Sequence, residues 1–216
     1  MSIKDYKTII QTNHGKILFF GIFLVVLLSG FIFIYYFIDA EFANKISAMV
    51  VANIAVGRVP SLSLGYASQL SHFWVISTNI YIEMVMVTLL YATFVFSYNN
   101  MLQIRFLDNF FKKVEEYKIQ YAEFFDKYGI LGLFVFVFIP FWMTGPIVGA
   151  IIGYLIGLRH ITVMITVFIA TIFAMSMWGL LLNELITVMN MFDSSIIWFV
   201  LVIVIVLILG AKFYRR

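Results

Sequence analysis

Cysteine is absent from this chain of 216 residues, and charged residues and prolines are scarce. The absence of cysteine excludes disulfides, thiolate metal sites and cysteine nucleophiles. Only 12% of the residues are charged and 63% are hydrophobic, whereas soluble domains contain about 25% charged and about 45–50% apolar residues. A chain of this length cannot bury so much apolar surface in its own core. The composition therefore predicts a polytopic membrane protein and excludes a soluble enzyme.

The sequence also lacks the motifs of enzymes. It contains no HExxH, GxSxG or phosphate-loop spacing, and Glu83 has no matched carboxylate for acid–base catalysis. His72 and His160 are expected at opposite membrane interfaces, where they anchor helix ends and cannot share a metal ion. We therefore predict neither enzymatic activity nor a cofactor. The net charge of +3 does not predict a nucleic-acid partner, because basic residues beside apolar runs more commonly set membrane topology.

Four apolar runs are long enough to span a membrane, which requires about 20 residues. The predicted transmembrane helices are residues 17–38, 73–98, 161–182 and 194–214. The first run is too long for the apolar region of a signal peptide, so we interpret it as a retained helix. All of these segments belong to a single integral membrane domain, residues 1–216.

All three prolines lie in two further apolar stretches, residues 46–72 and 129–158. Prolines and glycines interrupt both stretches near the middle: Gly57 and Pro60 in the first, Pro140, Gly145 and Pro146 in the second. The arms on either side have about 12–14 residues, too few to cross about 30 Å at 1.5 Å per residue. We therefore predict two re-entrant helical hairpins, whose broken backbone faces protein or a water-filled cavity rather than lipid.

Residues 99–128 form the only sizeable polar segment, and their apolar side chains recur at helical spacing. We predict that this segment is an amphipathic linker on the cytoplasmic membrane surface. With a cytoplasmic N-terminus and each hairpin re-entering from its own side, 12 of the 14 basic residues are cytoplasmic. The positive-inside rule therefore predicts a multi-pass protein with both termini in the cytoplasm.

The two hairpin regions resemble each other when the sequence is shifted by 88 residues. Seven of the 22 positions from 57 to 78 are then identical: Gly57, Gly65, Tyr66, Leu70, His72, Val75 and Thr78. Composition alone predicts about one or two identities. The predicted fold class is therefore an all-α membrane protein with two inverted repeats, each a re-entrant hairpin followed by a transmembrane helix, plus flanking N- and C-terminal transmembrane helices. Inverted repeats with broken helices are typical of secondary transporters.

The hairpin sequences resemble the small multidrug export family over residues 17–186. The similarity lies in the run from Gly57 to Gly65, GRVPSLSLG, and in the later pairs Ile139-Pro140, Thr144-Gly145, Gly149-Ala150 and Gly157-Leu158. More distantly, that family resembles the DedA membrane proteins, whose two opposed re-entrant hairpins are associated with transbilayer movement of lipid carriers such as undecaprenyl phosphate. The resemblance implies a location in the prokaryotic cytoplasmic (inner) membrane.

The chain departs from these two family patterns at two places. Val59 follows the Gly57-Arg58 pair where the export pattern often has an acidic residue. Phe141-Trp142-Met143 stands where the DedA pattern has arginines in the second hairpin. Arg58 is therefore the only basic residue predicted deep in the membrane.

Two charged residues are predicted near the centre of the membrane. Arg58 lies at the tip of the first hairpin, and Glu83 lies ten residues into the following span, about 15 Å along its axis. A charge at the centre of a membrane helix costs about 2.5–3.5 kcal/mol, so such residues persist where a pair or a cavity receives them. Two interpretations remain open: a substrate or proton site, and a structural ion pair that fixes the hairpin to the helix.

Four further residues complete the candidate substrate- or ion-binding site: Asn53, Asn79, Thr144 and Gly145. The asparagines are interpreted either as polar contacts of the site or as interhelical hydrogen bonds. Thr144 and Gly145 are predicted at the opposing hairpin tip, either as backbone donors to an anionic group or as a plain helix break. Glycines at four-residue spacing also predict a smooth helix face that packs against another helix: Gly145, Gly149, Gly153 and Gly157.

The leading hypothesis is a small secondary transporter or flippase that moves an amphipathic solute or a lipid-linked phosphate such as undecaprenyl phosphate. Proton coupling through Glu83 is a further hypothesis. The alternative is a scaffold that transports nothing, or a passive lipid scramblase, with the same fold. The expected partners are membrane lipid and an amphipathic small molecule or lipid phosphate, and a homo-oligomer remains open.

Overall fold

The computed structural model describes residues 12–98, 112–113, 116, 119–120, 122–139 and 145–191. These residues form seven helices and no strand, which confirms the all-α prediction. Three of the helices are long and apolar enough to cross a membrane: α2 (Asn13–Ile38), α5 (His72–Tyr98) and α9 (His160–Met191). The predicted fourth transmembrane helix, residues 194–214, and most of the predicted linker, residues 99–128, lie outside the described residues.

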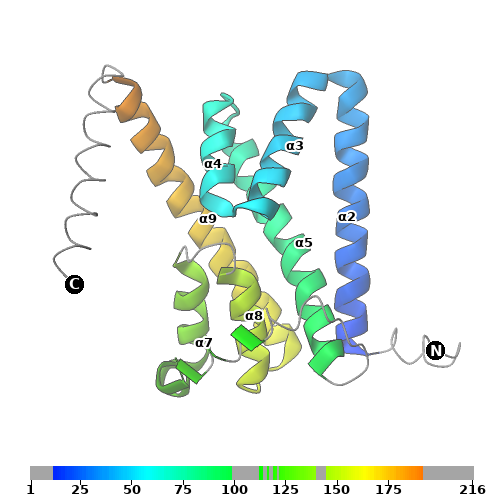
Figure 1. Ribbon diagram of the computed structural model, residues 1–216, viewed down its shortest axis with the longest axis vertical. Helices are drawn as coiled ribbons and strands as arrows, with labels where there is room; N and C mark the ends of the chain where they lie inside the picture. Colours follow the sequence, from blue (N-terminus) through cyan, green and yellow to red (C-terminus); the bar gives the residue numbers. More distant parts are fainter. Residues whose placement is uncertain are drawn as a thin grey trace, which may run out of the picture.

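The three long helices run the length of the molecule (Figure 1). α2 is capped by Thr12, whose Oγ1 accepts a hydrogen bond from the Gly15 amide at 3.2 Å. α5 runs back antiparallel to α2, and the hydroxyl of Tyr81 on α5 donates to the Leu24 carbonyl on α2 at 2.8 Å. α9 extends nine residues beyond Leu182, where the predicted apolar run ends. A helix can continue past the end of an apolar run because its hydrogen bonds form within its own backbone.

Two shorter helices between α2 and α5 form the first helical hairpin. α3 (Ala40–Ala55) is capped by Asp39, whose Oδ1 accepts a hydrogen bond from the Phe42 amide at 3.0 Å. α4 (Arg58–Ala67) runs back alongside α3 after a turn at Gly57. Gly57 has φ 119° and ψ −173°, a conformation that is accessible almost exclusively to glycine. The turn therefore depends on the absence of a side chain at this position.

The second helical hairpin consists of α7 (Ala122–Phe138) and α8 (Gly145–Leu155). α7 is kinked at Gly129, where φ is 49° and ψ is −117°. The predicted smooth glycine face is found on α8 for Gly149 and Gly153, where a Cβ atom would lie 2.5 Å from Val137 and 3.0 Å from Leu133 respectively. Gly157 does not belong to this face, because it follows the end of α8 with φ 85°, and a Cβ atom there would have no neighbour within 4 Å.

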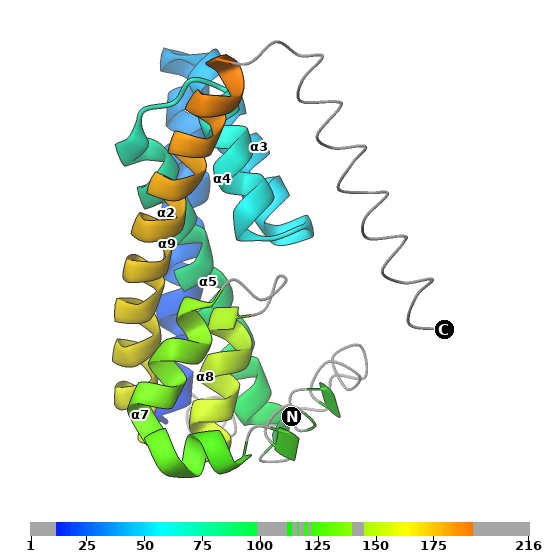
Figure 2. The same ribbon diagram turned by 90° about the vertical axis from the view of Figure 1, so that its left-hand side faces the viewer.

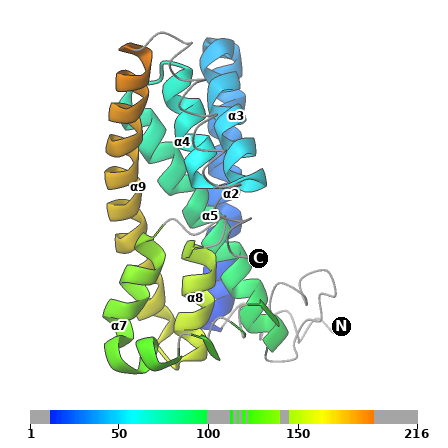
Figure 3. The same cartoon turned by 60° about the vertical axis from the view of Figure 1, so that its left-hand side comes forward.

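The hairpins occupy opposite halves of the molecule. Figures 1 and 3 show α3 and α4 in the upper half and α7 and α8 in the lower half, both packed against α5 and α9. Figure 2 shows the same separation from the side. Each hairpin has its own apolar cluster: Met49, Leu62 and Val75 are buried in the upper one, and Leu133, Ile151 and Val163 in the lower one. As a result, α4 and α8 both begin near the middle of the molecule.

Candidate functional site

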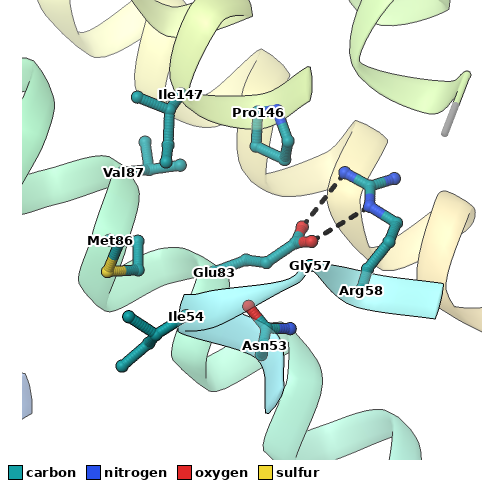
Figure 4. A pocket seen from close by; sticks show the side chains of 9 residues that line it. All are labelled: Asn53, Ile54, Gly57, Arg58, Glu83, Met86, Val87, Pro146 and Ile147. Atoms are coloured by element: carbon teal, nitrogen blue, oxygen red, sulfur yellow. Dashed lines mark hydrogen bonds and ion pairs between the residues drawn. The ribbon is translucent and has the colours of Figure 1, made fainter. Parts of the chain in front are cut away.

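Arg58 and Glu83 form an ion pair in the interior of the protein (Figure 4). Arg58 is the first residue of α4, and Glu83 lies near the middle of α5. The guanidinium donates from Nε to Oε1 at 3.0 Å and from Nη2 to Oε2 at 3.2 Å. Arg58 is 6% exposed and Glu83 is 7% exposed. The two-pronged geometry satisfies both carboxylate oxygens, as a buried pair requires.

Arg58 also contacts the second hairpin. Its Nη1 donates to the carbonyl of Val137 at 3.4 Å. Val137 lies in the last turn of α7, where a carbonyl has no partner within its own helix. Arg58 therefore gives this carbonyl a hydrogen-bond partner. The same side chain joins the first hairpin to α5 and to the second hairpin.

The start of α8 lies beside the same guanidinium. A Cβ atom at Gly145 would be 3.5 Å from Arg58 Nη2, and both Gly145 and Pro146 are buried. Gly145 therefore lies next to Arg58, at the tip that the sequence places opposite the first hairpin. Thr144, the other residue predicted at this tip, lies outside the described residues.

The two predicted asparagines contact each other. Asn53 on α3 donates from Nδ2 to Asn79 Oδ1 on α5 at 2.8 Å, and Asn79 Nδ2 donates to the Val75 carbonyl at 2.8 Å. This arrangement is an interhelical hydrogen bond between α3 and α5. Asn53 also faces the cavity beside Arg58, whereas Asn79 does not line it.

A small cavity of about 30 Å³ adjoins the ion pair. Its lining comes from α3, α4, α5 and α8: Asn53, Ile54, Gly57, Arg58, Glu83, Met86, Val87, Pro146 and Ile147 (Figure 4). A cavity needs about 10–15 Å³ to hold a water molecule, so this one admits water or a small ion but no amphipathic solute. The hydrogen bonds to Glu83 and Val137 use three of the five guanidinium N–H groups, which leaves two without a partner among the described residues.

Several residues of the site were not predicted from the sequence. The Val137 carbonyl is a backbone group, so its residue type carries no signal. The sequence does not distinguish the apolar residues of the lining from residues that face lipid: Ile54, Met86 and Ile147. Pro146 could have been found from the sequence, because it lies 88 residues after Arg58, at the spacing of the predicted repeat. Within the described residues, no three metal-ligating side chains come together.

Comparisons with known proteins identify the family of the chain. No curated protein and no solved structure gives a significant match. The family model described as "Putative small multi-drug export protein" matches residues 58–177, which is more than half of the 216 residues. The match begins at Arg58, includes Glu83 and Gly145, and ends within α9. The chain is therefore a membrane protein that belongs to the small multi-drug export protein family.

Proposed function

We propose that this protein is a secondary transporter that moves an amphipathic solute or a lipid-linked phosphate past the Arg58–Glu83 pair. The observation that carries the proposal is the position of Arg58, which contacts Glu83 on α5 and the Val137 carbonyl on α7 beside a small polar cavity. Intramembrane charges are costly, and they commonly mark substrate or ion pathways. The role of the pair is transport rather than catalysis.

The electrostatics of the site favour an anionic substrate group. Arg58 is cationic, and α4 and α8 both begin beside it, so the positive ends of two helix dipoles lie near the cavity. Glu83 is the carboxylate that neutralises this field when no substrate is bound. A phosphate or another anion that enters the cavity competes with Glu83 for the guanidinium, and a proton taken up by Glu83 releases Arg58 for that anion. This exchange is the proposed basis of proton coupling.

Matching contacts in the two hairpins support the inverted repeat on which the proposal rests. Tyr66 stacks on His72 with ring centroids 5.7 Å apart, and Tyr154, 88 residues later, stacks on His160 at 5.5 Å. A Cβ atom at Gly65 would lie 2.9 Å from Val75, and one at Gly153 would lie 3.0 Å from Val163. The ring stacking and the glycine contacts are therefore alike in the two halves, whereas the hydrogen bond to the histidine comes from Tyr66 in the first and from Tyr91 in the second.

The ends of α4 and α8 support the repeat through the backbone. After α4, the amide of Leu70 donates to the Gly65 carbonyl at 3.2 Å and that of Gln69 donates to the Tyr66 carbonyl at 2.9 Å. After α8, the amide of Leu158 donates to Gly153 at 3.0 Å and that of Gly157 to Tyr154 at 2.9 Å. Both ends are Schellman motifs, with Gln69 and Gly157 at positive φ. We propose that both hairpins re-enter the bilayer from opposite sides.

The proposal is tested by neutralising each member of the pair in purified protein reconstituted in liposomes. Arg58→Gln, Glu83→Gln and the double variant are compared for transport of a lipid phosphate and of a cationic amphiphile, with and without a pH gradient. Each single variant leaves an uncompensated buried charge and loses about 3–5 kcal/mol of stability, whereas the double variant recovers most of it. Activities are therefore normalised to folded protein. The pair of half-buried Lys45 and exposed Glu41 provides the matched control, because neutralising a pair at the protein surface costs about 1 kcal/mol or less.

The outcomes separate the substrate classes and the alternatives. Loss of phosphate transport in Arg58→Gln supports a lipid phosphate, whereas a cationic substrate depends on Glu83 and tolerates Arg58→Gln. If lipid moves at the same rate with and without the pH gradient, and in the wild type and both variants, the protein is a passive scramblase. No movement of any substrate by the wild type favours a scaffold. If the double variant loses as much stability as the two single variants together, Arg58 and Glu83 do not interact, and the ion pair is contradicted.

A further inference from the structure

A large apolar groove lies between α2, α5 and α9, separate from the cavity at Arg58. Its volume is about 800 Å³, within the range of about 300–1,000 Å³ that is typical of small-molecule sites. Phe20 on α2 and Ile165 on α9, which line it, are 55% and 53% exposed. The groove is therefore open to the surroundings of the helices rather than enclosed. It shares only Val87 with the lining of the polar cavity.

The length of the groove matches one leaflet of a bilayer. Along α9 it extends from Ile161 to Ile172, a distance of about 16 Å at 1.5 Å per residue. The hydrocarbon core of a bilayer is about 30 Å thick, so one leaflet is about 15 Å deep. α2 and α9 begin at the same end of the molecule (Figure 1), and the groove starts at that end with Lys16 and Ile161. An acyl chain of that leaflet therefore fits along its whole length.

Lys16 is the one charged residue in the lining of the groove. It lies in the first turn of α2, is exposed, and forms no ion pair with the described acidic residues. A lysine ammonium on its flexible stem reaches the headgroup layer from the end of a membrane helix. The groove thus has a cation at its interfacial end and an apolar lining towards the middle of the molecule, which is the charge pattern complementary to an anionic phospholipid.

We propose that this groove binds an anionic phospholipid, with an acyl chain along α2, α5 and α9 and the headgroup phosphate on the Lys16 ammonium. The site does not depend on the transport function proposed for Arg58 and Glu83, since neither residue lines it. The bound lipid fills the space between α2 and α9 beyond their direct contact at the end of the groove, where the rings of His14 and His160 lie 5.8 Å apart. It thereby stabilises the position of α2 against the rest of the protein.

Binding of defined lipids to the delipidated protein, measured by native mass spectrometry, tests the proposal. The probes are phosphatidylglycerol and phosphatidylcholine with identical acyl chains. Lys16→Gln removes the cation, and Arg159→Gln is its control because Arg159 is an exposed cation at the same end that does not line the groove. Ile165→Trp fills the groove, and Leu180→Trp is its control, since Leu180 lies on α9 outside the groove and is 54% exposed.

The wild type is expected to bind phosphatidylglycerol about fivefold more tightly than phosphatidylcholine, the factor that corresponds to about 1 kcal/mol for one basic residue at a membrane surface. Lys16→Gln abolishes this preference, Ile165→Trp weakens binding of both lipids, and the two controls resemble the wild type. A photoactivatable anionic phospholipid is expected to crosslink within residues 16–24 and 161–172.

Three results would overturn the proposal. If the wild type binds the two lipids with equal affinity, Lys16 does not select an anionic headgroup. Unchanged lipid binding in Ile165→Trp places the lipid elsewhere on the protein. Tighter binding of a cationic amphiphile such as tetraphenylphosphonium to Lys16→Gln than to the wild type, together with its loss in Ile165→Trp, assigns the groove to a cationic ligand instead.

Discussion

Arg58 joins three parts of the chain through one side chain. It begins α4, pairs with Glu83 on α5 and donates to the Val137 carbonyl on α7. The carboxylate that the family pattern often places directly after Arg58 is replaced here by Val59, and Glu83 provides the acid from another helix. Because three elements meet at one guanidinium, a movement of either hairpin relative to α5 changes the hydrogen bonds of this residue.

Gln69 is the one described non-glycine residue with positive φ, at 59°. A side chain in this left-handed region costs about 1 kcal/mol, and the equivalent position after α8 is already glycine, Gly157. We predict that Gln69→Gly raises the free energy of unfolding by about 1 kcal/mol. The measurement is the thermal unfolding temperature of the purified protein in detergent.

The reverse substitution provides the matched control for Gln69→Gly. A Cβ atom at Gly157 would have no neighbour within 4 Å, so the main effect of Gly157→Gln is on the backbone preference. We expect this variant to lose about as much stability as Gln69→Gly gains. A gain of stability in Gly157→Gln would contradict the left-handed conformation at these helix ends.

The two charged residues of the site could be predicted from the sequence, whereas the backbone carbonyl that Arg58 contacts could not. The depths of Arg58 and Glu83 predicted that the two lie close together, and the structure places them in contact. Asn53 and Asn79 were predicted near the site, and their contact with each other is one of the two interpretations left open. The Val137 carbonyl escapes prediction because every residue has such a group, and only the end of α7 makes it available.

At the scale of helices, the close packing of α7 and α8 depends on Gly149. A Cβ atom there would lie 2.5 Å from Cγ2 of Val137. We predict that Gly149→Ala separates the two helices and lowers stability by about 1–3 kcal/mol, the usual cost of overpacking. Chemical or thermal unfolding in detergent measures this loss.

Gly30 provides the control for the packing of α7 and α8. It lies within α2, and a Cβ atom there would have no neighbour within 4 Å, so Gly30→Ala introduces no clash. Alanine is the better helix former by about 1 kcal/mol, and Gly30→Ala is therefore expected to be neutral or stabilising. Equal destabilisation by Gly149→Ala and Gly30→Ala would argue against the tight contact between α7 and α8.

The presence of the long helices was predictable from the apolar runs, but their ends were not. The first hairpin was predicted from residue 46, whereas α3 begins at Ala40, directly after the capping residue Asp39. Asp39 is a typical N-cap and was a usable signal. No such signal in the sequence indicated the extension of α9 past Glu184, because a helix can continue beyond the end of its apolar run.

At the scale of the whole molecule, the proposed topology places α3 and α4 in the outer half of the bilayer and α7 and α8 in the cytoplasmic half. Since the chain has no cysteine, single cysteines can be introduced without background. We predict that cysteines at Lys127 and Arg159 react with a membrane-impermeant reagent only from the cytoplasm, and cysteines at Glu41 and Glu184 only from outside. All four residues are exposed. Reaction of Glu41→Cys and Arg159→Cys from the same side would exclude the opposed arrangement of the hairpins.

The small size of the cavity beside Arg58 has a kinetic consequence. A space of about 30 Å³ has no room for an amphipathic solute, so the described residues leave none for such a solute to pass the ion pair in this conformation. Any solute that crosses there must wait until Arg58 leaves the Val137 carbonyl and the hairpin tips separate. Under the proposed transport function, passage through the site is then a carrier cycle with one substrate per opening, so the transport rate saturates with substrate concentration and falls steeply on cooling, unlike flow through a pore.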